Sequence, residues 1–134
     1  MTIEEVSLKL CSVFETKPEV EVCLLFGSAA KGKSGVNSDI DIAICGDKAF
    51  THDYLAELQV AIAERLGTEV DLLDMARMNG MILRQVITTG KKILNHNPDL
   101  LAHYIKKMLF FSEDMYPNYQ MILKAKVKRF AHGY

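Results

Sequence analysis

Two aspartates separated by one residue, Asp39 and Asp41, are the side chains of this sequence whose spacing most clearly indicates chemistry. They alternate with Ile40, Ile42 and Ile44, and a β-strand places successive side chains on opposite faces. Both carboxylates are therefore expected on one face, where they repel each other and resist burial. A solvated strand face is one interpretation. The other is a site for a hard divalent cation such as Mg²⁺, which prefers carboxylate and phosphate oxygens.

The loop before these aspartates is rich in glycine, serine and lysine, and it follows an apolar run over residues 22–26. Backbone N–H groups in a short helical turn near 28–31, together with Lys31 and Lys33, would cradle a triphosphate. The alternative is an ordinary surface turn, which glycine and serine also favour. The acids that follow the loop favour the phosphate interpretation.

Gly27 and Ser28, ten intervening residues and then Asp39-x-Asp41 resemble the signature of the polymerase-β-like nucleotidyltransferases. Within that superfamily the chain most resembles the minimal nucleotidyltransferases, small bacterial antitoxins that act beside HEPN-domain RNase toxins. The likeness covers roughly residues 20 to 95, and it is specific because phosphate loop and acid pair occur in the family's order and context.

The resemblance implies a role for each matching residue. In the family the Gly-Ser turn binds nucleotide phosphates, and a third carboxylate comes from the next strand, which points to Asp71 in the pattern VDLLD. Without the resemblance, Asp71 would be interpreted as a carboxylate on an edge strand that faces water. Lys31 stands where arginine is common, so it keeps the charge but loses bidentate phosphate geometry. The implied catalytic and metal-binding residues are Asp39, Asp41 and Asp71, and the implied nucleotide-binding residues are Gly27, Ser28 and Lys31.

A second motif overlaps the same loop. Residues 27–34 satisfy the P-loop pattern G-x-x-x-x-G-K-[ST], in which Lys33 and Ser34 would open a helix that leads into a crossover. Only residues 35–38 separate Ser34 from the strand that carries the aspartates. Four residues cannot form that helix, so the match is interpreted as a coincidence of composition and kept only as a distant alternative.

Composition indicates one domain of an ordinary globular protein. The 134 residues are 49% hydrophobic and 25% charged, and the net charge of −1 favours neither a nucleic-acid partner nor a membrane surface. The N-terminus is polar, and no apolar run approaches membrane-spanning length. The cysteines are odd in number and lack a C-x-x-C pair, which fits reduced thiols in the core and a cytoplasmic location.

Local patterns predict an α/β fold: a small mixed β-sheet with helices packed mainly on one face and a C-terminal helical tail. Thr2 and Glu5 form a capping box, and Gly67 is placed to end the second helix. The first strand is expected to be central and the last, with its lysines, to lie at an edge. Helices are expected over 2–16, 52–66, 76–89 (with Met78, Ile82, Leu83 and Val86 inward), from Pro98 and over about 117–130. Strands are expected over 19–26, 39–44, 68–73 and 91–94. Residues 1–95 would form the nucleotidyltransferase domain and 96–134 the helical tail.

The acids and the loop together predict an enzyme that transfers a nucleoside monophosphate and releases pyrophosphate. The resemblance implies two Mg²⁺ ions, ATP as the donor and a tyrosine of a HEPN toxin as the acceptor, so that AMPylation silences the RNase of a toxin–antitoxin pair. Two other classes stay open. One is a small-molecule nucleotidyltransferase of the aminoglycoside-modifying type, for which the tail is short, and the other is a non-catalytic antitoxin that blocks its toxin sterically.

Overall fold

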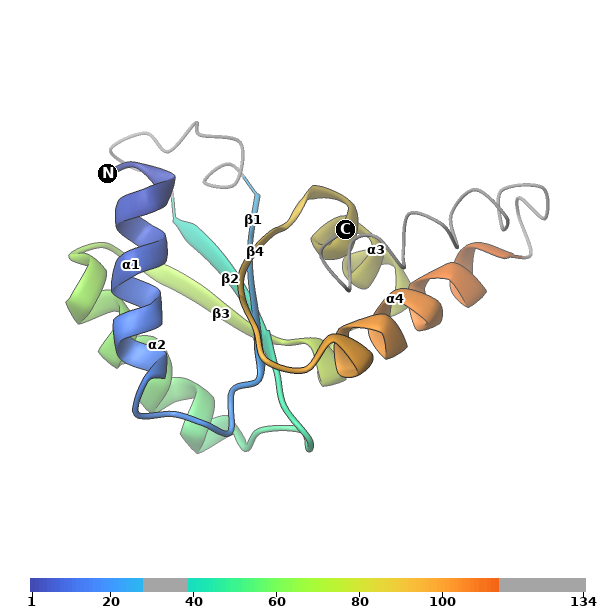
Figure 1. Ribbon diagram of the computed structural model, residues 1–134, viewed down its shortest axis with the longest axis horizontal. Helices are drawn as coiled ribbons and strands as arrows, with labels where there is room; N and C mark the ends of the chain where they lie inside the picture. Colours follow the sequence, from blue (N-terminus) through green and yellow to red (C-terminus); the bar gives the residue numbers. More distant parts are fainter. Residues whose placement is uncertain (28–38, 114–134) are drawn as a thin grey trace.

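The computed structural model describes residues 1–27 and 39–113, which form a four-stranded sheet between two layers of helices (Figure 1). This arrangement confirms the predicted α/β fold. The strands are β1 (Val22–Phe26), β2 (Ile40–Cys45), β3 (Val70–Asp74) and β4 (Lys91–Asn95). The helices are α1 (Ile3–Phe14), α2 (His52–Leu66), α3 (Gly80–Thr89) and α4 (Pro98–Glu113), with a short 3-10 helix η2 (Met75–Arg77).

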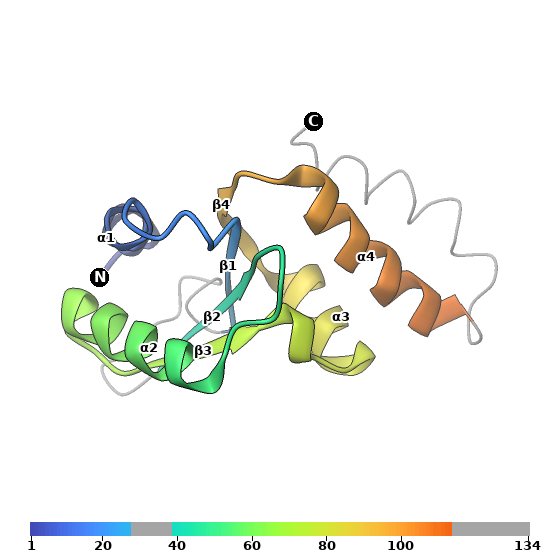
Figure 2. The ribbon, with the colours of Figure 1, turned by 90° about the horizontal axis from the view of Figure 1, so that it is seen from below.

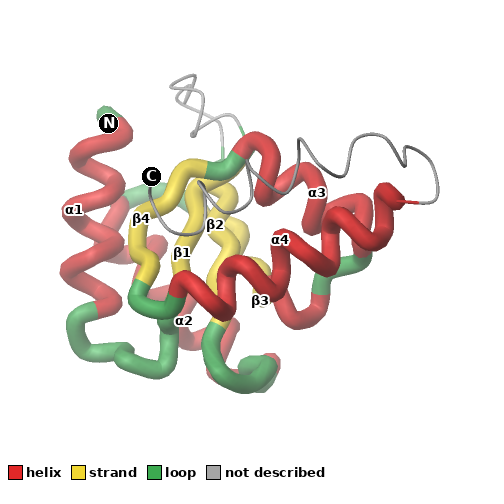
Figure 3. Tube along the Cα trace, turned by 45° about the vertical axis from the view of Figure 1, so that its right-hand side comes forward, coloured by secondary structure: helices red, strands yellow, loops and turns green. Residues whose placement is uncertain are grey.

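The sheet is mixed, as predicted, and its order is β3-β2-β1-β4. β1 pairs antiparallel with both β2 and β4, whereas β2 and β3 are parallel. The first strand is therefore central and β4 lies at an edge, which confirms both expectations (Figure 3). The parallel pair follows from α2, because a strand that returns in the same direction needs a crossover of this kind.

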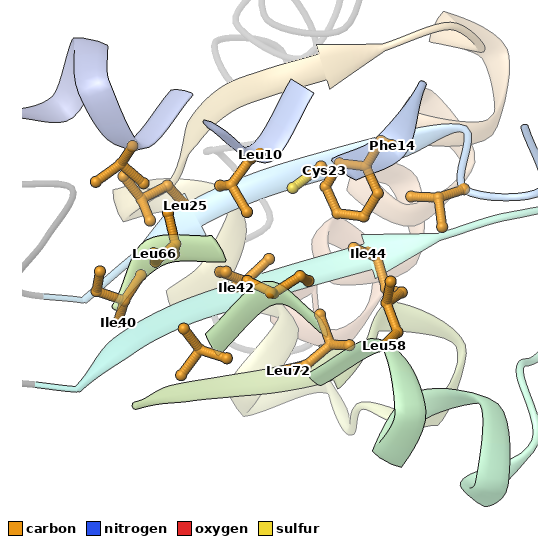
Figure 4. Packing of buried hydrophobic residues seen from close by; sticks show 14 of the residues in the cluster. Leu10, Phe14, Cys23, Leu25, Ile40, Ile42, Ile44, Leu58, Leu66 and Leu72 are labelled. Carbon is orange, nitrogen blue, oxygen red and sulfur yellow. The ribbon is translucent and has the colours of Figure 1, made fainter. Parts of the chain in front are cut away.

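One face of the sheet packs against α1 and α2. Ile40, Ile42 and Ile44 project from β2 toward Leu10 of α1 and Leu58 of α2 (Figure 4). The alternation of β2 therefore separates its isoleucines from Asp41, as the sequence predicts. Burial of each such aliphatic side chain contributes roughly 1.5–3 kcal/mol, so this cluster holds β2 firmly in place.

The opposite face is also covered, so the expectation that helices pack mainly on one face is wrong. Val22, Leu24 and Phe26 of β1 and Ala43 of β2 lie in a second core with α3 and α4. Figure 2 shows the two helix pairs on opposite sides of the sheet. The physical reason lies in β1, whose five residues are all apolar and all buried, and a strand of that kind needs cover on both faces.

The helix predicted over 76–89 is divided into η2 and α3. Met78 is extended, and the Asn79 side chain accepts a hydrogen bond from the Ile82 backbone N–H at 3.0 Å, which caps α3. Gly80 follows, and the ring of Phe111 in α4 packs so closely on it that a Cβ would collide. Ile82 is 41% exposed, so its predicted inward position is wrong. The inward residues of α3 are Leu83, Val86 and Ile87.

Other local signals are confirmed. The Thr2 hydroxyl accepts from the Glu5 backbone N–H at 3.2 Å and caps α1. Gly67 ends α2 in the left-handed region, with φ of 73°, where glycine carries no steric penalty. Of the three cysteines expected in the core, Cys23 and Cys45 are buried free thiols there, whereas Cys11 is only half-buried. Burial raises the pKa of the Cys45 thiol to about 12.

Two predicted segments, the turn near residues 28–31 and the helix over about 117–130, lie outside the described residues. Within the described ranges, none of the helices combines the length and the apolar character needed to cross a membrane.

Asp74 connects elements at the end of β3. It is buried, with 3% of its surface exposed, and its Oδ2 accepts from the Phe50 backbone N–H at 2.8 Å. Its Oδ1 accepts from the Ala76 N–H at 2.9 Å and caps η2. Arg77 donates to the Phe50 carbonyl at 2.6 Å. The segment that leads into α2 is thereby tied to the end of the parallel pair.

Replacement of Asp74 should therefore destabilise the fold. Asp74→Ala removes a buried acceptor and leaves two backbone N–H groups without it, so we expect a loss of about 2–4 kcal/mol in the free energy of unfolding. Urea denaturation monitored by circular dichroism measures this value. Asp47→Ala, at an exposed turn, is the matched control and should change it by less than about 0.5 kcal/mol. Equal values for the two variants would contradict the structural role of Asp74.

Candidate active site

Three neighbouring strands bring the predicted acids and the phosphate loop to one end of the sheet. Asp41 of β2 lies opposite Phe26 of β1 in the antiparallel register, so Gly27 follows directly beside it. On its other side, Asp41 is paired with Asp71 of β3 in the parallel register. Asp39 is exposed and stands one residue before β2. The structure therefore brings together all three predicted carboxylates and the first residue of the loop.

The carboxylates repel one another in the way that the sequence predicts. Partial burial is the main cause that raises the pKa of Asp41 above its ordinary value, and the charges of Asp71 and Asp39 raise it further. The Asp41 and Asp71 carboxyl groups are also close enough to hydrogen-bond to each other, which favours a proton on Asp41. The site thus concentrates negative charge, and it would attract a cation.

Gly27 has a conformation and a position that exclude a side chain. Its φ is +71°, in the left-handed region, and a Cβ built there would collide with Oδ2 of Asp41. Among the described residues, the other glycine with positive φ is Gly67, and a Cβ there would meet nothing within 4 Å. The glycine at the loop start therefore lets the backbone turn directly over a carboxylate.

The donor set fits a hard divalent cation in chemistry. The ligands would be carboxylate oxygens, and a cation would relieve the repulsion that raises the pKa of Asp41. In the described ranges, no three acidic, histidine or cysteine side chains are already grouped tightly enough to hold a metal ion. Asp41 and Asp71 form the close pair, and exposed Asp39 would complete the set by moving its side chain.

Two of the predicted nucleotide-binding residues, Ser28 and Lys31, lie outside the described residues. Their roles stay predictions. The part of the predicted phosphate loop that the structure describes is Gly27, which has the geometry expected of a close backbone approach.

One residue of interest was not among the predicted site residues. Leu73 follows Asp71 on the same face of β3, and its side chain is 40% exposed. The signal for a shared face was present, because residues i and i+2 of a strand point the same way. Its exposure could not be read from the pattern, since VDLL is also typical of a buried strand.

The raised pKa of Asp41 predicts a dependence of stability on pH. Between the unfolded pKa of about 3.9 and the higher folded pKa, the folded protein binds the proton that the unfolded chain releases, so stability falls as pH rises through this window. Asp41→Asn should therefore raise Tm at pH 7 with EDTA present and change it much less at pH 3. Since Asp41 is only partly buried, the shift should be modest.

Thermal unfolding of both proteins at the two pH values measures this effect. Asp47→Asn, an exposed acid at the far end of β2, should leave Tm unchanged at both. A lower Tm for Asp41→Asn at pH 7 would show that the ionised carboxylate stabilises the fold, contrary to the prediction.

Comparisons with known proteins agree with this geometry. A curated relative, the protein adenylyltransferase MntA of Shewanella oneidensis, is 36% identical over 84 residues, which are 61% of this chain and 59% of that protein. The match therefore spans less than two thirds of the length of that relative.

Solved structures share the fold. A chain from a crystal structure of a toxin–antitoxin complex with AMP-PNP has a TM-score of 0.73 and 26% identity, covering 89% of this chain and 96% of that one. A chain from the complex of a tri-AMPylated HEPN toxin of Shewanella oneidensis with its MNT antitoxin has a TM-score of 0.68. It is 22% identical and covers 91% of this chain and 96% of that one, a likeness that shows the fold alone.

The family model described as Polymerase beta, Nucleotidyltransferase matches residues 8–99, which include β1, β2 and β3 with the three carboxylates and Gly27. With more than half of its residues in this match and the fold of solved relatives, the chain belongs to the polymerase-β nucleotidyltransferase family.

Proposed function

We propose that this chain is a Mg²⁺-dependent adenylyltransferase that moves AMP from ATP to a tyrosine of a HEPN-domain toxin, and that it acts as the antitoxin of that pair. The observation that carries the proposal is the placement of Asp41 beside Asp71 across the parallel strands, directly next to Gly27. This supports a site in which a pair of carboxylates lies at the start of the predicted phosphate-binding loop. A cytoplasmic location belongs to the same proposal, and the free thiols of Cys11, Cys23 and Cys45 support it.

The relatives support the identity of donor and acceptor. The curated relative is a protein adenylyltransferase, and the solved toxin–antitoxin complex at 26% identity contains AMP-PNP, an analogue of ATP. The fold shared with the antitoxin of the AMPylated HEPN toxin is consistent with the same kind of partner. Neither of the other classes, small-molecule transfer or steric inhibition alone, has an observation in this structure that favours it.

The reaction is a displacement at the α-phosphorus of ATP. The tyrosine oxygen forms a bond to this phosphorus while the bond from it to the bridging α,β oxygen breaks. Pyrophosphate leaves, and Asp71 accepts the phenolic proton as general base. The loop that starts at Gly27 would hold the β and γ phosphates through backbone N–H groups, with Ser28 and Lys31. These residues orient the nucleotide, because a positioned ligand reacts far faster than a free one.

Asp39, Asp41 and Asp71 would hold the metal ions. When bound, Mg²⁺ supplies positive charge that stabilises the attacking and leaving oxygens. Asp41 would lie at the centre of this set, because its strand lies between those that carry Asp71 and Gly27. Its ionisation would be favoured by the metal, which reverses the effect of its acidic neighbours.

Loss of one carboxylate should separate catalysis from binding. We expect wild-type protein, at a tenth of the toxin concentration with Mg²⁺ and ATP, to add AMP mass to a toxin tyrosine and to abolish RNase activity after the antitoxin is removed. Asp71→Asn should lower the transfer rate at least about 100-fold, since a general base typically contributes that much. Mass spectrometry and an RNA-cleavage assay on a HEPN-domain toxin, sought first in the reading frame next to this one, measure both effects.

Asp47→Asn is the matched control and should transfer AMP at the wild-type rate, because Asp47 lies beyond the opposite end of β2. If wild type adds no mass but protects in equimolar amount, and Asp71→Asn protects equally, the chain acts as a steric antitoxin and the enzymatic proposal is wrong.

Metal and nucleotide should bind together. A ligand that binds only the folded state, at a concentration of 100 times its Kd, raises the free energy of unfolding by about 2.7 kcal/mol. Mg²⁺ with ATP should therefore raise Tm by several degrees. Each ligand alone should have a smaller effect, and the double variant Asp39→Asn with Asp41→Asn should lose the synergy. Differential scanning fluorimetry measures it. An undiminished shift in the double variant would place the nucleotide elsewhere, and Lys33→Ala would then test the P-loop alternative.

A further inference from the structure

The order of the sheet determines from which side an acceptor can approach. Gly27 follows β1, Asp41 lies on β2 and Asp71 lies on β3, in the spatial order β1, β2, β3. In an in-line displacement the attacking oxygen stands opposite the leaving oxygen. Given the proposed function, on which this inference rests, pyrophosphate lies over β1 beside Gly27. The acceptor hydroxyl therefore arrives over β3 beside Asp71.

The strand on this side carries an exposed apolar side chain beside Asp71. Leu73 is next to Asp71 on the same face of β3 and is 40% exposed. Leu73 is unusual in the described chain, because the other large apolar side chains with such exposure lie on helices or at the N-terminus. The residues of β1 and the isoleucines of β2 are buried.

The packing explains why Leu73 stays uncovered. α3 and α4 cover β1 and the middle of the sheet, and Ala43 of β2 belongs to the core that they form with it. Leu73 of β3 is paired with Ala43 in the parallel register, but it is not part of that core. β3 is the outer strand on that side (Figures 1 and 2). With 40% of its surface exposed, Leu73 leaves apolar area in water that contact with a ligand would bury.

We propose that Leu73 determines acceptor specificity by contacting the aromatic ring of the acceptor tyrosine while the phenolic oxygen reaches Asp71. Residues i and i+2 of a strand are about 7 Å apart along the strand, so a side chain with its oxygen at Asp71 can extend over Leu73 only if it is long. A tyrosine ring satisfies this condition. Serine and threonine place their hydroxyls too close to the backbone to do so.

The variant Leu73→Ala tests the contact. It should lower kcat/KM for the toxin tyrosine about tenfold, the lower end of the 10- to 200-fold effect of one methylene in an enclosed apolar pocket, because Leu73 is partly exposed. KM for ATP should stay at the wild-type value, since the nucleotide lies on the other side of Asp41. Leu73→Met, of similar volume, should retain most of the activity.

Val60→Ala is the matched control, because Val60 is an exposed aliphatic side chain on α2, outside the α3–α4 face. It should leave both constants unchanged. The inference is overturned if kcat/KM for the acceptor is unchanged in Leu73→Ala, or if KM for ATP rises by the same factor.

A binding measurement tests the contact even if wild type transfers no AMP to the toxin, the result that would refute the proposed function. With Mg²⁺ and AMP-PNP present, N-acetyltyrosinamide should shift the Leu73 methyl resonances in a ¹³C-methyl NMR spectrum, and N-acetylserinamide should not. The methyl resonances of Val60 serve as the reference. Equal shifts with both probes, or none with either, would show that Leu73 does not select an aromatic acceptor.

Discussion

The parallel pairing of β2 with β3 is the constraint on which the candidate site depends. It holds Asp41 beside Asp71 although the two carboxylates repel each other, and the raised pKa of Asp41 is the sign of that conflict. The pairing persists because the other faces of these strands lie in the core, where each aliphatic side chain contributes roughly 1.5–3 kcal/mol. A few buried isoleucines and leucines therefore outweigh the repulsion between partly solvated carboxylates.

The two ends of the parallel pair have different tasks. At one end, the carboxylates and Gly27 form a crowded and acidic arrangement, which in our proposal holds metal and phosphate. At the other end, Asp74 is buried with both oxygens hydrogen-bonded, and it ties the entry to α2 to the start of η2. Aspartates of the same two strands thus differ in role: Asp74 stabilises the fold, and in our proposal Asp41 and Asp71 take part in the reaction. The difference lies in whether backbone N–H groups satisfy the carboxylate oxygens.

The shared fold also bears on acceptor choice. The family match covers β1, β2 and β3 with the three carboxylates, so under the proposed function these elements would serve the transfer itself and would not distinguish one acceptor from another. Discrimination must come from neighbouring surface that contacts the acceptor and not the nucleotide. In our proposal β3 has this task, because it carries Asp71 and is also an outer strand on which Leu73 is 40% exposed.

The sequence by itself determined the local features: the caps at Thr2 and Gly67, the alternation of β2 and the chemistry of its acids. These follow from interactions between residues close in the chain, which a pattern can express. Only the tertiary structure decided that helices cover both faces, that Asn79 divides a predicted helix and that Leu73 is exposed. The register that joins Asp41 to Asp71 was likewise implied by a family resemblance and established by pairing between distant segments. Strand pairing depends on long-range packing, and a shift of one residue would have turned these carboxylates to opposite faces.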